Sequence, residues 1–171
     1  MDPAGLEQQI AQLHHATFAW ALACCRWNVS EAEEVLQSTY VRVLEGQARY
    51  AGRASFKSWL FSVVRNVAAE TRRRRWIRQL ALERWFKGSP TDETSPGPDE
   101  ALDSDQRGAR VRRALGQLAG RQQEVLDLVF FHGLTIEEAA LVMGVALGTA
   151  RVHYQRGKRR LLAMLAPEME K

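Results

Sequence analysis

The sequence lacks the features that mark membrane-embedded or exported proteins. No apolar run approaches the roughly 18 residues that a membrane span needs. The N-terminus has no basic segment followed by an apolar one. Neither half shows an alternating apolar pattern of useful length, which argues against β-strands. We therefore expect a cytoplasmic protein without a sheet.

Cysteine and histidine are too sparse to build a redox or metal site. The two cysteines, Cys24 and Cys25, are adjacent, so a disulfide between them would be strained. We interpret them as small, buried helix residues. His14 and His15 point about 100° apart on a helix and cannot hold a metal together without other ligands. We expect no metal and no cofactor.

Charge is distributed unevenly along the chain, although the formal net charge is only +4. Residues 49–87 carry eleven Arg or Lys against two Glu, a local charge of +9. Residues 88–106 carry six acids and no base, a local charge of −6. The basic segment favours a polyanion as partner, although a solvated arginine-rich face would have the same composition.

A segment rich in turn-forming and acidic residues divides the chain. It reads KGSPTDETSPGPDE and cannot bury enough apolar surface to order itself. On both sides of it, apolar residues recur at helical spacing. They are Val35, Tyr40, Val41 and Leu44, then Phe56, Trp59, Leu60, Val63, Val64 and Val67, then Leu118, Val125, Leu128 and Val129. We predict an all-α protein of two small helical domains, residues 1–86 and 107–171, joined by a flexible acidic linker at 87–106.

Three helix starts are visible in the sequence. Ser30 precedes Glu33 by three residues, and Thr135 precedes Glu138 by three, which is the spacing of a capping box. Ser55 stands before a long helical pattern that ends in four arginines. We predict helices that begin after these three residues.

The stretch LTIEEAALVMGVALGTARVHYQRG contains two helical patterns separated by Gly144. A glycine in the left-handed conformation is a common helix end. The small residues Ala140 and Ala150 flank it at the spacing of a helix-turn-helix. We predict this motif, with its second helix starting near Leu147.

The predicted second helix has a buried stripe and a polar outer face. The stripe consists of Ala150, Tyr154, Gly157 and Leu161. Because glycine costs about 1 kcal/mol against alanine inside a helix, we expect an early end or bend at Gly157. A helical hairpin that only packs has the same spacing, but the basic outer face favours DNA. The candidate base-reading residues are Arg151, Val152, His153, Gln155 and Arg156, followed by the phosphate contacts Lys158 and Arg159.

In the first half, aromatic and basic residues are interleaved between residues 49 and 65. Aromatic faces stack on unpaired bases while cations follow the backbone, as in the capture of single-stranded nucleic acid. The alternative is that Phe56 and Trp59 are core residues, which periodicity favours for Trp59. The interleaved set is Arg49, Tyr50, Arg53, Phe56, Lys57, Trp59 and Arg65.

Three motifs occur in the order EAEEVLQSTYVRVLEG, GRASFKSWLFSVVRNVAAETRRRR and LAGRQQEVLDLVFFHGLTIEEAALVMGVALGTARVHYQRGKRRLLAML. They resemble the region 2 and region 4 signatures of bacterial extracytoplasmic-function (ECF, group 4) sigma factors. The resemblance covers most of residues 10–85 and 110–165. It implies a transcription initiation factor without catalytic residues or a small-molecule substrate. Its partners would be core RNA polymerase, promoter DNA and a separate anti-sigma protein, which can be membrane-anchored.

The resemblance also implies three sets of contacts. The polymerase clamp would be bound by Glu33, Glu34, Val35, Gln37 and Tyr40. The minus-ten element would be captured and melted by Arg49, Tyr50, Arg53, Ser55, Phe56, Lys57, Trp59, Arg65, Asn66, Arg72 and Arg73. The outer face of the second helix of the helix-turn-helix would read the minus-thirty-five element. A stress, envelope or metal response is the implied setting.

The chain departs from the family pattern at two places. GTARVHYQRGK stands where the family often has GTVKSRLHRAR, so Val152 and His153 replace serine and arginine, and Tyr154 replaces an apolar residue. The promoter preference is therefore not inherited. EEVLQSTY lacks the usual acidic residue after the glutamine, which affects one clamp contact.

Two other classes of protein remain as alternatives. A helix-turn-helix regulator that does not replace sigma would need an apolar self-association face and palindromic sites. A nucleic-acid enzyme such as a recombinase would need a nucleophile or clustered carboxylates. Glu31, Glu33 and Glu34 are close in sequence, but they belong to a helix start, where acids complement the helix dipole.

Overall fold

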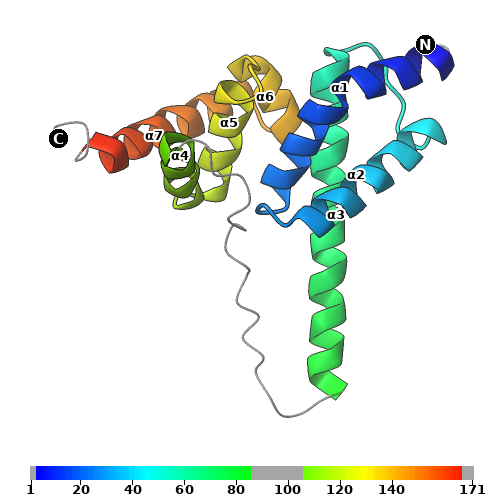
Figure 1. Cartoon of the computed structure of the whole chain (residues 1–171), viewed down its shortest axis with the longest axis horizontal. Helices are drawn as coiled ribbons and strands as arrows, with labels where there is room; N and C mark the ends of the chain where they lie inside the picture. The colour runs from blue at the N-terminus through cyan, green and yellow to red at the C-terminus, as the bar shows by residue number, and fades with distance from the viewer. Residues whose placement is uncertain (1–2, 86–105, 167–171) are drawn as a thin grey trace. The chain divides into compact units, whose positions relative to one another are not determined.

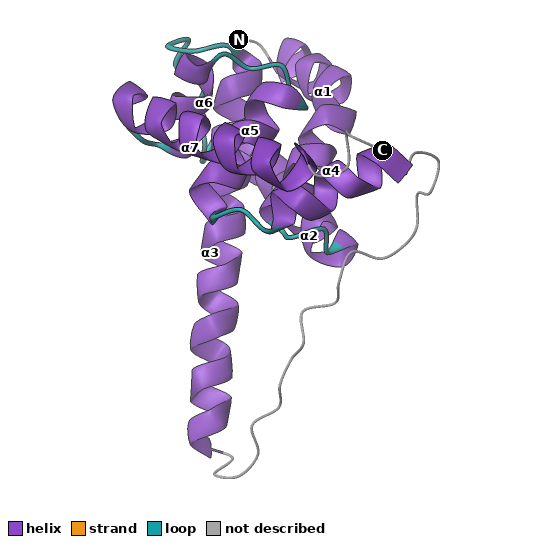
Figure 2. Cartoon of the chain, turned by 90° about the vertical axis from the view of Figure 1, so that its left-hand side faces the viewer, coloured by secondary structure: helices purple, strands orange, loops and turns teal. Residues whose placement is uncertain are grey.

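A computed structural model describes residues 3–85 and 106–166, and all regular elements in these two ranges are helices (Figures 1 and 2). The prediction of an all-α protein is confirmed. Among the described residues, no helix combines the length and apolarity that a membrane span requires. The helices are α1 (Pro3–Cys24), α2 (Val29–Leu44), α3 (Phe56–Trp85), α4 (Gln106–Gly116), α5 (Gly120–Phe130), α6 (Ile136–Met143) and α7 (Leu147–Leu165).

The chain divides into two compact units. The first consists of Met1–Arg49 and Val63–Asp99, and the second of Tyr50–Ser62 and Glu100–Lys171. The start of α3 is thus grouped with the second unit and the remainder of α3 with the first. The predicted acidic linker falls outside the described residues except for its last residue, which begins α4.

The turn between α1 and α2 decides where α2 begins. Arg26 and Trp27 both adopt left-handed backbone conformations, with φ of 53° and 66°. They place Asn28 as the N-cap of α2, where its side-chain oxygen accepts the backbone N–H of Glu31 at 3.0 Å. The capping box predicted at Ser30 is therefore wrong, because the turn starts the helix two residues earlier.

The first unit buries the face of α2 that carries Val35, which is 1% exposed. α1 contributes Trp20 and α3 contributes Val64 to the same core. Val41 and Leu44, two other members of the apolar pattern, are 46% and 52% exposed. Leu44 lies about 180° around α2 from Val35, on the face away from the core.

The start of α3 is capped as predicted. The Ser55 hydroxyl accepts the backbone N–H of Ser58 at 3.2 Å, and the Ser55 carbonyl accepts the N–H of Trp59 at 3.0 Å. α3 then continues without interruption for 30 residues. The predicted helix over this segment is confirmed and extends beyond the four arginines.

In the second unit, α5, α6 and α7 pack on one another and α4 packs on α7. Thr135 and Glu138 form the predicted capping box at the start of α6. Gly144 ends α6 in the left-handed conformation, with φ of 64° and ψ of 38°. α7 then begins at Leu147, so the predicted helix-turn-helix is present as α6, the glycine turn and α7.

Candidate nucleic-acid interface

The contact between α7 and α5 fixes which face of α7 is outward. Ala150 is fully buried and Gly157 is buried. At Gly157 a Cβ atom would lie 3.1 Å from the Cβ of Gln122, 3.1 Å from the Cδ1 of Leu126 and 3.3 Å from the Gln122 carbonyl oxygen. Glycine is thus the residue that lets the two helices approach. The expectation that α7 ends early at Gly157 is wrong, because α7 continues to Leu165.

The opposite face of α7 is polar and mostly exposed. His153 is half-buried, whereas the other predicted DNA-reading and phosphate-binding side chains are exposed. An exposed basic face on the second helix of a helix-turn-helix is the geometry that enters a major groove. The exposed members are Arg151, Val152, Gln155, Arg156, Lys158 and Arg159.

An ion pair joins the two helices of the motif at this face. Nη2 of Arg151 donates to Oε1 of Glu137 on α6 at 3.2 Å. The two side chains are 60% and 59% exposed, and such surface pairs contribute only about 0 to 1 kcal/mol. The pair therefore orients the guanidinium rather than stabilising the fold. Sequence spacing did not reveal Glu137, because the contact crosses the turn.

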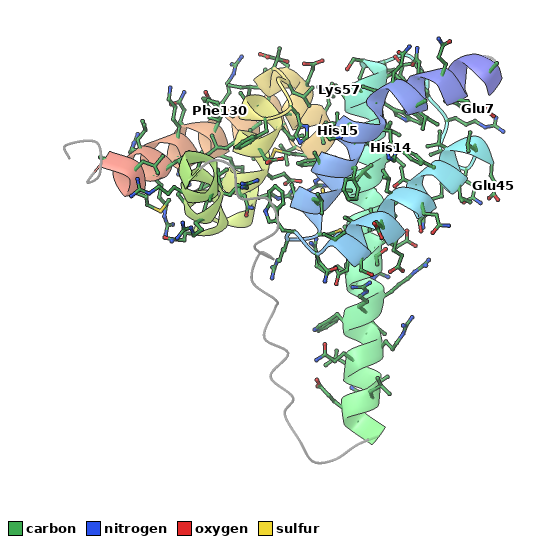
Figure 3. The ribbon with its side chains drawn as sticks, in the orientation of Figure 1. Glu7, His14, His15, Glu45, Lys57 and Phe130 are labelled. Carbon is green, nitrogen blue, oxygen red and sulfur yellow. The ribbon has the colours of Figure 1, made fainter. Side chains whose placement is uncertain are left out.

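Tyr154, which stands where the family often has an apolar residue, contacts an aromatic residue of α5. The Tyr154 ring stacks on the Phe130 ring with centroids 6.1 Å apart and an interplanar angle of 26°. Phe130 is 55% exposed and is labelled in Figure 3. Tyr154 is half-buried, so it covers an aromatic neighbour at the edge of the predicted stripe.

Arg121 on α5 is a positioning residue that sequence reasoning missed. Its Nη1 lies 3.2 Å from Oε2 of Glu124 and 3.4 Å from the carbonyl oxygen of Met143. Met143 is the last residue of α6, where carbonyl groups lack partners within the helix. Arg121 therefore holds the end of α6 beside the turn that leads to α7.

The three predicted stacking aromatics form a cluster. The ring centroids of Tyr50, Phe56 and Trp59 lie 5.2 to 5.4 Å apart in each pair. The Tyr50 hydroxyl donates to the carbonyl oxygen of Ala54 at 2.5 Å and closes the loop before α3. Phe56 is only 9% exposed. It supports the loop from inside, so we withdraw it as a base-stacking residue, whereas Tyr50 and Trp59 are half-buried.

Lys57 and Ser55 contact protein groups within the second unit. Nζ of Lys57 donates to the carbonyl oxygen of His132 at 2.5 Å. The Ser55 hydroxyl donates to Oε1 of Glu138 at 3.3 Å. The pKa of the Glu138 carboxyl is lowered, chiefly because the backbone N–H of Thr135 donates to it. Any nucleic-acid contact by Lys57 or Ser55 must replace these partners.

The arginines of α3 differ in what they contact. Arg75 pairs with Glu31 and, at 2.9 Å, with Glu34 on α2. Arg74 pairs with Glu70 at 2.5 Å. Arg72 and Arg73, the two predicted to bind DNA, are exposed, and no ion pair involving them occurs among the described residues. Of the other α3 candidates, Arg65 is half-buried and Asn66 is exposed. In the loop before α3, Arg49 and Arg53 are exposed.

Glu70 is also paired with Arg42 on α2 at 2.7 Å. The hydrogen bond from Arg42 is the main cause that lowers the pKa of Glu70. This acid therefore stays ionised between two arginines. It links α2 to α3.

The predicted polymerase-binding residues of α2 do not all share one face. Glu33, Glu34 and Gln37 are exposed. Val35 is 1% exposed and packs in the core, so it is not available to a partner. Tyr40 is half-buried, and burial raises its pKa. Its hydroxyl lies 3.1 Å from Nδ1 of His14 on α1. Val35 must be removed from this set.

The described residues contain no cluster of three or more potential metal ligands. Both cysteines are free thiols. Burial raises the pKa of Cys25 to about 11, so this thiol stays protonated at neutral pH. Cys24 is only half-buried, unlike the small buried residue that we expected.

Both halves of the chain match one protein family. Sigma-70 region 2 matches residues 11–78, and Sigma-70, region 4 matches residues 108–161. Over 140 residues the chain is 31% identical to the ECF RNA polymerase sigma factor SigE of Mycolicibacterium smegmatis. Over 135 residues it is 30% identical to the ECF RNA polymerase sigma factor SigX of Bacillus subtilis. The chain belongs to the ECF sigma-70 family.

The alignments cover only part of the length of each relative. The SigE alignment covers 81% of this chain and 53% of SigE, so the chain spans about half of that relative. The SigX alignment covers 77% of this chain and 69% of SigX. The region 2 match covers most of α1, all of α2 and most of α3, and the region 4 match covers α5, α6 and most of α4 and α7. Sigma factors are initiation factors and not catalysts.

Solved structures share the fold of this sigma factor. The sigma factor RpoE of Bartonella quintana, in complex with the anti-sigma factor NepR, has a TM-score of 0.72 at 24% identity. That comparison covers 95% of this chain and 97% of the other. CnrH, in complex with the cytosolic domain of CnrY, has a TM-score of 0.64 at 22% identity and covers 98% and 91%. At these identities the likeness supports the fold.

Proposed function

We propose that this sigma factor binds core RNA polymerase and directs it to promoters that carry two spaced elements. The observation that carries the proposal is the exposed basic face of α7 in a helix-turn-helix. In this role residues 1–86 bind the polymerase and melt the minus-ten element, and residues 107–171 read the minus-thirty-five element. Residues 87–106 connect them.

In this proposal each half has a separate chemical task. Arg151 and Arg156 read the duplex, because arginine forms paired hydrogen bonds with guanine or contacts phosphate. Tyr50 and Trp59 flank the site of the flipped base, where a few kcal/mol of unstacking energy must be offset. Glu33, Glu34, Gln37 and Tyr40 present polar groups to the polymerase clamp.

Transcription with purified components tests the proposal. The chain and core polymerase are combined with genomic promoter fragments, and transcript start sites are mapped. We expect initiation from specific sites only when both proteins are present. Failure to bind core, together with dimeric binding to a palindromic operator, would establish the helix-turn-helix regulator instead.

Arginine substitutions locate the reading face. Arg151→Ala and Arg156→Ala should each weaken upstream-element binding, by roughly 1 to 3 kcal/mol for a paired guanine contact. A guanine contact relaxes preference at one base, whereas a phosphate contact weakens all sequences alike. Arg113→Ala, at an exposed arginine of α4, is the matched control. Unchanged binding in both α7 variants would put the reading face elsewhere.

We propose that this sigma factor belongs to group 4 and acts in the cytoplasm. Its setting is a stress, envelope or metal response. A separate anti-sigma protein restrains it, covering the surface of α2 near Glu33 to Tyr40 and part of the second unit. Pull-down from unstressed cells should recover this protein, membrane-anchored or not, at near-equal stoichiometry. The recovered protein should abolish core binding when added back. Recovery of polymerase alone in resting and induced cells would argue for control by synthesis or turnover.

A further inference from the structure

The C-terminal part of α3 carries an exposed apolar patch beyond the core of the first unit. Trp76, Ile77 and Leu80 are 61%, 50% and 39% exposed. In both views this part of α3 extends past α1 and α2 (Figures 1 and 2). We propose that these three residues, the distal patch, dock an acidic amphipathic helix of a partner protein.

Helical geometry gathers the distal patch on one side of α3. At about 100° per residue, Trp76, Leu80 and Ile77 fall within an arc of about 100°. Arg73 and Arg84 lie on the same side, one turn before and one turn after the patch. Both arginines are exposed, and no hydrogen bond or ion pair holds either one among the described residues. The exposed Glu83 lies on this side too, seven residues after Trp76 and next to Arg84. The surface is thus a short apolar centre with an arginine at each end and one carboxylate beside Arg84.

This arrangement matches the centre and rim of a protein interface. Interfaces concentrate their binding energy in a few central residues, among which tryptophan is enriched, and surround them with a polar rim. A single exposed apolar side chain is ordinary, but neighbouring large ones on one helix face indicate an interaction site. The basic rim calls for carboxylates on the partner at matching positions.

The same geometry argues against three other occupants. A second copy of this helix would bring two arginines and only one carboxylate, Glu83, against the same set, so a net repulsion between like charges would remain. A lipid surface favours a helix with a longer apolar face, whereas here arginines interrupt that face about one turn on either side. Nucleic-acid phosphates would pair with the arginines but leave Trp76 and its apolar neighbours in water. An acidic helix of similar length satisfies both the apolar centre and the rim.

Site-specific photocrosslinking of the full chain in its native cells tests the proposal. The variants are Leu80→p-benzoylphenylalanine and Leu82→p-benzoylphenylalanine. Leu82 is a matched control, because it is an exposed leucine of the same helix on the opposite face, 53% exposed. The crosslinked segment is identified by mass spectrometry. A synthetic peptide of that segment is then titrated against the purified chain.

We expect capture from position 80 alone of a protein segment with apolar residues at helical spacing and flanking Asp or Glu. Trp76→Ala should weaken binding of the peptide roughly thirtyfold, as at an interface hot spot. Leu82→Ala should change it less than threefold. Circular dichroism should show all variants equally helical, since these side chains lie outside the core. Capture of lipid, nucleic acid, the acidic residues 88–106 of this chain, another copy of the chain or a non-acidic segment overturns the proposal. So does equal capture from both positions, or none.

Discussion

Replacing Gly157 with alanine should destabilise the second unit, although alanine is the better helix former. The substitution gains about 1 kcal/mol of helix propensity. It also places a Cβ 3.1 Å from two carbon atoms and 3.3 Å from the carbonyl oxygen of Gln122. Cβ and O of Gln122 are fixed by the α5 backbone, so relief requires α7 to move. Overpacking of this kind costs typically about 1 to 3 kcal/mol. We expect a net loss of about 1 kcal/mol.

Gly148→Ala is the matched control on the same helix. A Cβ at Gly148 would meet nothing within 4 Å, so only the gain of about 0.4 to 1 kcal/mol should remain. Hydrogen exchange of peptides from α5 and α7, measured in the full chain, reports the opening free energy of this region. We expect the opening free energy to fall in Gly157→Ala and to rise in Gly148→Ala. A stabilising Gly157→Ala would refute the close approach of α5 and α7.

Three further outcomes follow from the caps and the thiols. Asn28→Ala should cost about 1 kcal/mol of unfolding free energy, whereas Ser30→Ala should stay within about 0.5 kcal/mol, as measured by urea unfolding. The pKa of Glu138 is lowered, so its stabilising effect should be complete above its ordinary pKa and disappear as the pH falls through the lowered value. The stability difference between the wild type and Glu138→Gln should shrink accordingly between pH 7 and pH 3. Cys25, with a pKa of about 11, should react with iodoacetamide much more slowly than Cys24 at pH 8, and equal rates would contradict its burial.

Local patterns in the sequence predicted the helices and several of their ends. The capping box at Thr135 and Glu138 and the left-handed glycine at position 144 involve groups within one turn of each other. Spacing found these two features, whereas the same spacing at Ser30 failed because the turn at Arg26 and Trp27 starts α2 earlier. The same spacing identified the outer face of α7, and the motifs pointed to the family that the comparisons then confirmed.

Only the tertiary structure decided which apolar residues are buried and which glycine is needed. Val35 and Leu44 are both apolar and lie on opposite faces of α2, and Val35 is 1% exposed whereas Leu44 is 52% exposed. Burial depends on which side of α2 the other helices cover, and helical periodicity does not contain that information. Gly157 lowers helix propensity in the sequence but fits the approach of α5 in the fold. The sequence specifies the helices and their chemistry, whereas distances between helices determine what each side chain can contact.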